Sequence, residues 1–171
     1  MKLIDKVLEI SSSGVSNTFP SNISNNILDE KDKHLFQRPP GEEHYRLLAE
    51  ISSVMDFGLV YDIGTNKGLS ALALAANESV DVISYDIRWS VNVNRPRNIE
   101  FRVGNFYNDP ILLKADFIFV DIDPHDGSNE RIVLKYLKDH NYTGLVMFDD
   151  IYQFDGMKKF WESIEQPKHD L

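Results

Sequence analysis

Five short runs of apolar residues are the clearest pattern in the chain. They occupy residues 59–63, 80–86, 99–103, 117–121 and 145–149. They do not alternate between apolar and polar positions, which is typical of strands that are buried on both faces of a sheet. Segments with helical spacing of apolar residues flank most of them, at residues 42–54, 69–76, 130–140 and 156–164. This order predicts an α/β fold with a doubly wound, mostly parallel, Rossmann-like sheet.

The beginning of the chain has a different pattern. Residues 2–10 are predicted to form a short helix, whereas residues 11–14 and 21–26 are rich in Ser and Asn. Such segments bury too little apolar surface to fix themselves in place. We therefore divide the chain into residues 1–40, a helix with a flexible arm, and residues 41–171, one folded domain. The arm is either a flexible terminus or a lid over a site on the domain.

Composition narrows the range of partners. The chain has 171 residues, which suits a single domain, and it contains no Cys, which excludes disulfides and thiolate chemistry. Its formal net charge of −9 argues against nucleic acid and against an anionic membrane surface as partners. We find neither a secretory signal nor an apolar run long enough to span a bilayer. We expect a cytoplasmic protein that binds a small molecule, and a homo-oligomer is compatible with this pattern.

Four of the five predicted strands end in an aspartate. These are Asp62, Asp86, Asp121 and Asp149. In an open parallel sheet, the ligand crevice lies outside the carboxyl ends of the strands. A single aspartate there would be an ordinary turn residue, but four that converge on one edge indicate a binding site.

The turn after the first strand is rich in glycine. Residues 62–70 read DIGTNKGLS, with Gly64 and Gly68 allowing a tight turn and a close approach to a ligand. Asn66 stands where a dinucleotide-binding G-x-G-x-x-G motif has its second glycine. The sequence also lacks the Gly-Lys-Ser/Thr of a phosphate-binding P-loop. Pyrophosphate ligands, including nicotinamide dinucleotides, are therefore disfavoured.

The second and third strands add two features of a nucleoside site. Asp86 lies 22 residues after Gly64, where a carboxylate can accept hydrogen bonds from both ribose hydroxyls. Asn105 and Phe106 follow the third strand, where an amide and an aromatic ring can read and stack on an adenine. The alternative for this pair is a polar turn with a core Phe.

Residues 61–70 resemble the first motif of the class I S-adenosylmethionine-dependent methyltransferases, D-x-G-x-x-x-G-x-S. The resemblance covers about residues 40–165. It implies the methyltransferase form of the Rossmann-like sheet and S-adenosylmethionine as the cofactor. The cofactor-binding residues that it implies are Asp62, Gly64, Thr65, Gly68, Ser70, Asp86, Ile87, Asn105, Phe106 and Asp121.

A second group of acidic residues follows the fourth and fifth strands. Asp121 would lie beside Asp149 and Asp150, and three carboxylates in one crevice raise one another's pKa unless a cation lies among them. The pattern resembles the metal-dependent O-methyltransferases of the catechol and macrolide-sugar types. That resemblance implies a Mg²⁺ ion bound by Asp121, Asp149 and Asp150. The alternative is that Asp149 and Asp150 only cap the loop and the next helix.

The chain departs from this group of enzymes in its proton acceptor. The catechol type uses a Lys shortly after the first metal-binding Asp, but no Lys occurs from residue 115 to residue 134. His125 is the best replacement as catalytic base, since its ordinary pKa is near neutrality, and Asp123 is the second choice. The alternative for His125 is a structural role inside its turn.

Only residues 165–171 follow the last predicted helix, so the last two strands of the usual methyltransferase sheet are expected to be missing. Either the chain is truncated, or a partner covers the edge of its fifth strand. We expect a Mg²⁺-dependent O-methyltransferase that acts on a hydroxylated small molecule. The alternative is a methyltransferase-like module that binds S-adenosylmethionine without turnover, and a nicotinamide oxidoreductase ranks third.

Overall fold

A five-stranded sheet forms the centre of the protein, which a computed structural model describes over residues 2–13, 21–39 and 41–171. The strand order is β3-β2-β1-β4-β5, and all four neighbouring pairs are parallel. The strands are β1 (Gly58–Ile63), β2 (Val80–Asp86), β3 (Ile99–Val103), β4 (Phe117–Val120) and β5 (Leu145–Phe148). The predicted doubly wound parallel sheet is therefore confirmed.

The direction of winding reverses between β1 and β4. The chain first builds outward from β1 to β2 and β3, and then returns to place β4 on the other side of β1. The register pairs Ile63 of β1 with Val120 of β4, so the two strands end side by side. A reversal of this kind leaves a crevice outside the carboxyl ends of the strands, because the following loops diverge.

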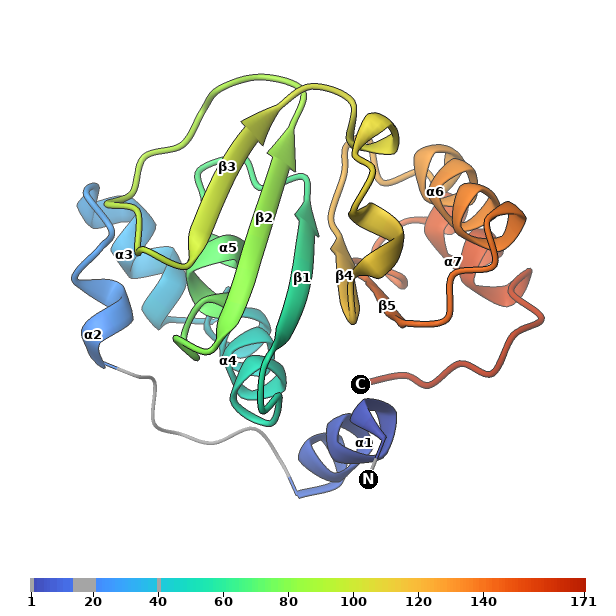
Figure 1. The fold of residues 1–171 in the computed structure, drawn as a ribbon, viewed down its shortest axis with the longest axis horizontal. Coiled ribbons are helices and arrows are strands. Elements are labelled where there is room, and N and C mark those ends of the chain that lie inside the picture. The colour runs from blue at the N-terminus through green and yellow to red at the C-terminus, as the bar shows by residue number, and fades with distance from the viewer. Residues whose placement is uncertain (1, 14–20, 40) are drawn as a thin grey trace.

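Helices cover both faces of the sheet (Figure 1). One face carries α4 and α5, with α1 and α3 packed on α4, and the other face carries α6 and α7. The bounds of the helices are α1 (Leu3–Ser13), α2 (Ser21–Ser24), α3 (Glu30–Gln37), α4 (Gly41–Ser53), α5 (Leu69–Leu74), α6 (Ser128–Asp139) and α7 (Asp155–Glu162), with short 3-10 turns η1 (Phe106–Asn108) and η2 (Leu112–Lys114).

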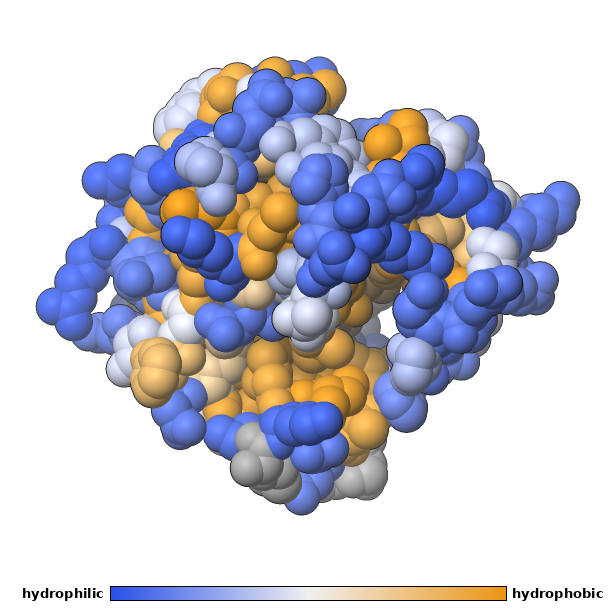
Figure 2. Space-filling model, turned by 45° about the vertical axis from the view of Figure 1, so that its right-hand side comes forward, coloured by the Kyte–Doolittle hydropathy of each residue, from blue (hydrophilic) through white to orange (hydrophobic). Residues whose placement is uncertain are grey.

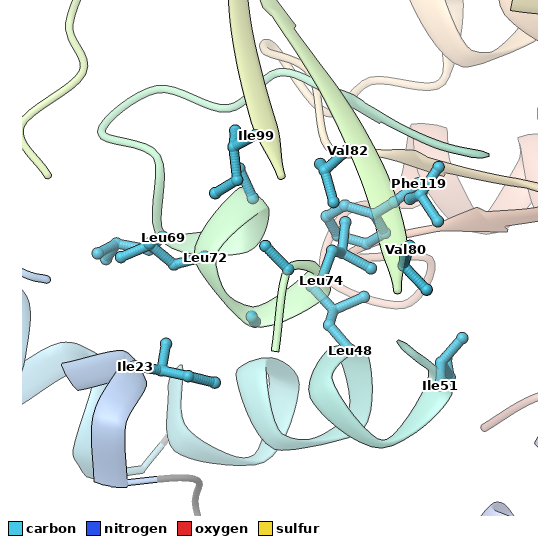
Figure 3. Close-up of a cluster of buried hydrophobic side chains, with 14 of the residues drawn as sticks. Ile23, Leu48, Ile51, Leu69, Leu72, Leu74, Val80, Val82, Ile99 and Phe119 are labelled. Carbon is cyan, nitrogen blue, oxygen red and sulfur yellow. The ribbon is translucent and has the colours of Figure 1, made fainter. Parts of the chain in front are cut away.

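The core beneath α4 and α5 joins described segments that lie far apart in the sequence, from α1 to β4. Leu48 and Leu72 of the helices meet Val82 and Phe119 of the sheet in one buried cluster (Figure 3). Ile23 of α2 belongs to the same cluster. Burial of this apolar surface is the main stabilising contribution to the fold.

The sequence did not predict α2 and α3, which lie within the segment interpreted as an arm. Asp29 caps α3, since its carboxylate accepts hydrogen bonds from the backbone N–H groups of Lys31 and Asp32. Phe36 and Ile27 are buried, so the described part of this segment packs on the domain. Residues 14–20 of the predicted arm lie outside the described residues, and its role as a lid stays a prediction.

A large cavity follows the free edge of β5. Among the described residues, β4 is the only strand that pairs with β5. The cavity has a volume of about 790 Å³, and apolar residues such as Leu47, Met147 and Trp161 line it together with Asp149 and Asp150. Apolar surface gathers in the lower half of the face drawn in Figure 2.

None of the helices in the described ranges is long and apolar enough to cross a membrane.

Candidate functional site

The glycine turn brings the end of β1 against the end of β4. Gly64 has a φ of +99°, and a Cβ at this position would lie 1.7 Å from the carbonyl oxygen of Asp121. Gly68 has a φ of +93°, and a Cβ there would press on Val93 and Phe101. Both positions therefore require glycine, because the backbone has a left-handed conformation there and neighbouring atoms leave no room for a Cβ.

Two buried polar atoms beside this turn have no hydrogen-bond partner in the described part of the chain. They are Asp62 Oδ1 and Thr65 Oγ1. The other oxygen of Asp62 accepts a hydrogen bond from Ser84 Oγ at 2.7 Å, and burial raises the pKa of this carboxyl group. Ser70 is also buried, in the first turn of α5. The hydroxyl groups of Ser70 and Thr65 lie close enough to lower the pKa of the Asp62 carboxyl group, so they interact with it, and a ligand with polar groups would compete for the same oxygens.

Asp86 ends β2 and faces the same turn. Its Oδ2 accepts a hydrogen bond from the N–H of Asn66 at 2.8 Å, and its Oδ1 accepts one from the N–H of Arg88 at 3.2 Å. A carboxylate oxygen can accept more than one hydrogen bond, so both oxygens can still accept from a ribose diol. Ile87 follows and is 87% exposed, so it offers an apolar surface beside this position.

Asn105 and Phe106 already have partners within the chain. The side chain of Asn105 accepts a hydrogen bond from the N–H of Tyr107, and the ring of Phe106 packs on Tyr107 at 4.1 Å between centroids. These contacts match the alternative prediction, a polar turn with a packed Phe. A Cβ on the preceding Gly104 would meet nothing within 4 Å, so the space beside this turn is open. A role in binding adenine stays a prediction.

Asp121, His125 and Asp150 form a compact group beyond β4 and β5. One ligand atom from each residue lies within 4.8 Å of the others. The pairing of Val120 with Phe148 explains why the two aspartates meet, since they follow the ends of adjacent strands. Two carboxylates and an imidazole at this spacing fit a divalent cation.

Asp149, the third predicted metal ligand, has a different partner. Its Oδ2 lies 3.1 Å from Nδ1 of His44, which comes from α4. The ring of His44 packs edge-on against Phe119 in β4, with 5.3 Å between ring centroids. His44 was not predicted as a site residue, because α4 precedes the sheet in the chain and nothing in its local pattern places it beside β5.

The pKa values of the cluster reflect its crowding. Burial, together with the charges of Asp149 and Asp150, raises the pKa of Asp121 to about 7. Burial and the charge of Asp149 raise the pKa of Asp150. Burial would also raise the pKa of Asp149, but the hydrogen bond from His44 lowers it overall. The acidic neighbours therefore help to raise the pKa of Asp121 and Asp150, and a cation among these carboxyl groups would lower both pKa values.

A salt bridge joins the glycine turn to α3. Lys67 Nζ lies 2.6 Å from Oδ1 of Asp32, whose side chain is buried. The second oxygen of Asp32 is buried without a partner among the residues described. This contact was not predicted, because it joins segments that are 35 residues apart in the chain.

Comparison with known proteins supports the same fold. No protein-family model matches the chain, and no curated protein matches it in sequence. The chain is similar to the S-adenosylhomocysteine-bound methyltransferase PaMTH1 of Podospora anserina, at 15% identity over 86% of this chain and 70% of that chain, with a TM-score of 0.50. This likeness shows a Rossmann-like methyltransferase fold.

Two further structures are similar at lower scores. One is coclaurine N-methyltransferase bound to N-methylheliamine and S-adenosylhomocysteine, at 16% identity over 85% of this chain and 50% of that chain, with a TM-score of 0.49. The other is the O-methyltransferase from Bacillus cereus in complex with S-adenosylhomocysteine, at 15% identity over 94% of this chain and 77% of that chain, with a TM-score of 0.44.

Proposed function

We propose that this protein is an S-adenosylmethionine-dependent O-methyltransferase that acts on a hydroxyl group of a small molecule with the help of a divalent ion. One observation carries the proposal. The glycine turn with Asp86 and the group of Asp121, His125 and Asp150 lie at the same carboxyl edge of one sheet. The methyl donor and an acceptor bound to the ion have to lie close together, because methyl transfer requires the acceptor oxygen in line with the methyl group of the donor.

The first half of the edge fits the cofactor. Asp86 would accept hydrogen bonds from the two hydroxyl groups of the ribose, next to the turn that it already holds through Asn66. The buried oxygens of Asp62 and Thr65 are suited to the polar amino-acid end of S-adenosylmethionine. Ile87 offers its exposed side chain to the base.

The second half of the edge fits the chemistry of the acceptor. When bound there, a divalent ion such as Mg²⁺ would lower the pKa of an acceptor hydroxyl. The acidic groups available to hold it are Asp121, Asp150 and the neighbouring Asp149. The sequence predicts His125 or Asp123 as the proton acceptor, and both belong to the loop after β4.

The cavity along β5 supports a small acceptor with an apolar body. Asp149 and Asp150 lie in its lining together with Leu145, Met147 and Trp161. A hydroxyl group at the acidic end of the cavity and an apolar skeleton along β5 would match this distribution. Its volume of about 790 Å³ is in the range of small-molecule sites.

The proposal is tested by incubating the protein with S-adenosylmethionine and a panel of catechols and sugar diols, with formation of S-adenosylhomocysteine as the readout. We expect transfer to at least one acceptor, its loss in excess EDTA, and its return when Mg²⁺ or Mn²⁺ is added. Transfer at full rate in excess EDTA would reject the ion. Binding of the cofactor without transfer to any acceptor would favour the module without turnover.

A further inference from the structure

His125 lies among carboxylates on both sides of its ring. Its Nε2 is 3.4 Å from Oδ1 of Asp123 and 3.7 Å from Oδ1 of Asp121, and its Nδ1 is 3.8 Å from Oδ2 of Asp150. The side chain of His125 is only 19% exposed, whereas that of Asp123 is 90% exposed. A general base needs a nitrogen directed at the acceptor, and here carboxylates lie beside both nitrogens.

We infer that His125 is a ligand of the ion, together with Asp121 and Asp150, and that Asp149 is not. Asp121, His125 and Asp150 each offer one ligand atom, and these three atoms lie within 4.8 Å of one another. The carboxylate of Asp123 is then placed to accept the N–H at Nε2 of His125. A carboxylate that orients the ring of a metal-binding histidine in this way is a common arrangement.

The backbone has a left-handed conformation at two of the three residues. His125 has a φ of +53° and Asp150 has a φ of +55°, although neither is a glycine. L-residues seldom adopt this left-handed conformation, and where they do, the surrounding structure has to hold them there. These two residues lie near each other in the structure, with 3.8 Å between Nδ1 of His125 and Oδ2 of Asp150.

Asp149 acts beside the ligands as a positioning residue. Its Oδ2 is engaged by Nδ1 of His44 at 3.1 Å, which ties β5 to α4 next to the ion site. The resulting ligand set differs from the three aspartates that the resemblance implies, because an imidazole replaces one carboxylate.

The mixed ligand set changes which ions are favoured. Carboxylates suit Mg²⁺ and Mn²⁺ alike, but an imidazole nitrogen favours first-row transition ions over Mg²⁺. We therefore expect Mn²⁺ and Co²⁺ to bind more tightly than Mg²⁺. This inference rests on one part of the proposed function, namely that the cluster binds a divalent ion. Ion binding can be measured without methyl transfer, so the two can be tested separately.

The experiment is a titration of the folded protein with Mn²⁺, in which free Mn²⁺ is followed by electron paramagnetic resonance. Pulsed measurements on the bound ion report coupling to a directly bound ¹⁴N nucleus. The variants are His125→Ala, His125→Gln and, as a matched control, His140→Ala, whose ring lies at the end of α6 and contacts the carbonyl oxygen of Tyr136. Circular dichroism and thermal unfolding verify that each variant is folded.

We expect the unmodified protein and His140→Ala to bind one Mn²⁺ with nitrogen coupling. Both His125 variants should bind Mn²⁺ about tenfold more weakly or worse and lose the coupling. Unchanged Mn²⁺ affinity in His125→Ala, with methyl transfer lost, would overturn the ligand assignment and leave the proposed function standing. Nitrogen-coupled Mn²⁺ in a protein that never binds S-adenosylhomocysteine would support the ligand set and overturn the proposed function.

Discussion

At the scale of single residues, Asp86 combines two tasks. Its carboxylate fixes the glycine turn through the N–H of Asn66, and it is the residue proposed to bind the ribose. The two tasks are compatible, since a carboxylate has about four lone-pair sites and the chain uses one on each oxygen. A substitution at this position should therefore affect the ligand and the turn together.

We predict that Asp86→Ala weakens binding of S-adenosylmethionine by about tenfold or more. Each charge-assisted hydrogen bond to the ribose contributes about 1.5–3 kcal/mol, and about 1.4 kcal/mol corresponds to a factor of ten. Isothermal titration calorimetry measures the effect. Asp81→Ala is the matched control, because Asp81 lies on the same strand but is exposed. Equal affinity in both variants would remove the ribose assignment.

Asp149→Ala should separate catalysis from cofactor binding. The residue lies beyond β5, on the far side of β4 from the glycine turn, and it is held by His44. We expect methyl transfer to be abolished while the affinity for S-adenosylmethionine stays nearly unchanged, because removal of Asp149 disturbs only the acidic half of the edge. A parallel loss of cofactor affinity, measured by calorimetry, would show that the two halves are not independent.

At the scale of elements, α3 is the segment that ties the beginning of the chain to the domain. Phe36 is buried and stacks on Tyr45 of α4, with 4.8 Å between ring centroids. We predict that Phe36→Ala lowers the free energy of unfolding by about 3–5 kcal/mol, through lost burial and the cavity left behind. Urea denaturation measures this change.

The neighbouring Leu35 provides the control for that measurement. Its side chain is 44% exposed, so Leu35→Ala should change the free energy of unfolding by much less than Phe36→Ala. If the two variants lose the same stability, or if neither loses any, α3 does not pack on α4 as described.

Hydrogen exchange tests whether the N-terminal segment responds to the cofactor. Lys67 of the glycine turn is bound to Asp32 of α3, so a ligand that orders the turn should also protect α3. We expect slower exchange over residues 11–37 when S-adenosylhomocysteine is present, with the larger effect in Glu30–Gln37. The same exchange rates with and without the ligand would count against a lid.

The sheet could be predicted from the sequence almost completely. All five strands lie within one residue of the predicted ranges, because strands buried on both faces leave uninterrupted apolar runs. The helices α2 and α3 could not be found in the same way. They are short and polar, and they are held in place by long-range burial of Ile23 and Phe36 rather than by local pattern. The capping aspartate Asp29 was the one local signal.

The candidate site was predicted only where its residues follow strands. Asp86, Asp121 and Asp150 stand at the sheet edge as expected, since strand order determines their place. His44 and Asp32 reach the edge from helices, and the packing of those helices is not encoded in any short motif. The spacing in the sequence could therefore predict where these aspartates lie, but it could not predict that Asp149 pairs with His44.

At the scale of the whole molecule, one sheet carries both halves of the proposed reaction. The strands β1 and β2 lead into the turn and the carboxylate that are proposed to bind the nucleoside, while β4 and β5 lead into the proposed ion site and line the cavity proposed for the acceptor. The two halves meet where β1 lies beside β4. The central claim is that this edge is a site for S-adenosylmethionine.

The most direct test is a calorimetric titration of the protein with S-adenosylhomocysteine, and separately with NAD⁺, in the presence of EDTA. We expect saturable binding of one S-adenosylhomocysteine per chain and no binding of NAD⁺, since the turn lacks the second glycine of the dinucleotide motif. EDTA should not weaken the binding, because the nucleoside half of the edge needs no ion. If the folded protein binds no S-adenosylhomocysteine, or binds NAD⁺ equally well, this edge of the sheet is not a site for S-adenosylmethionine.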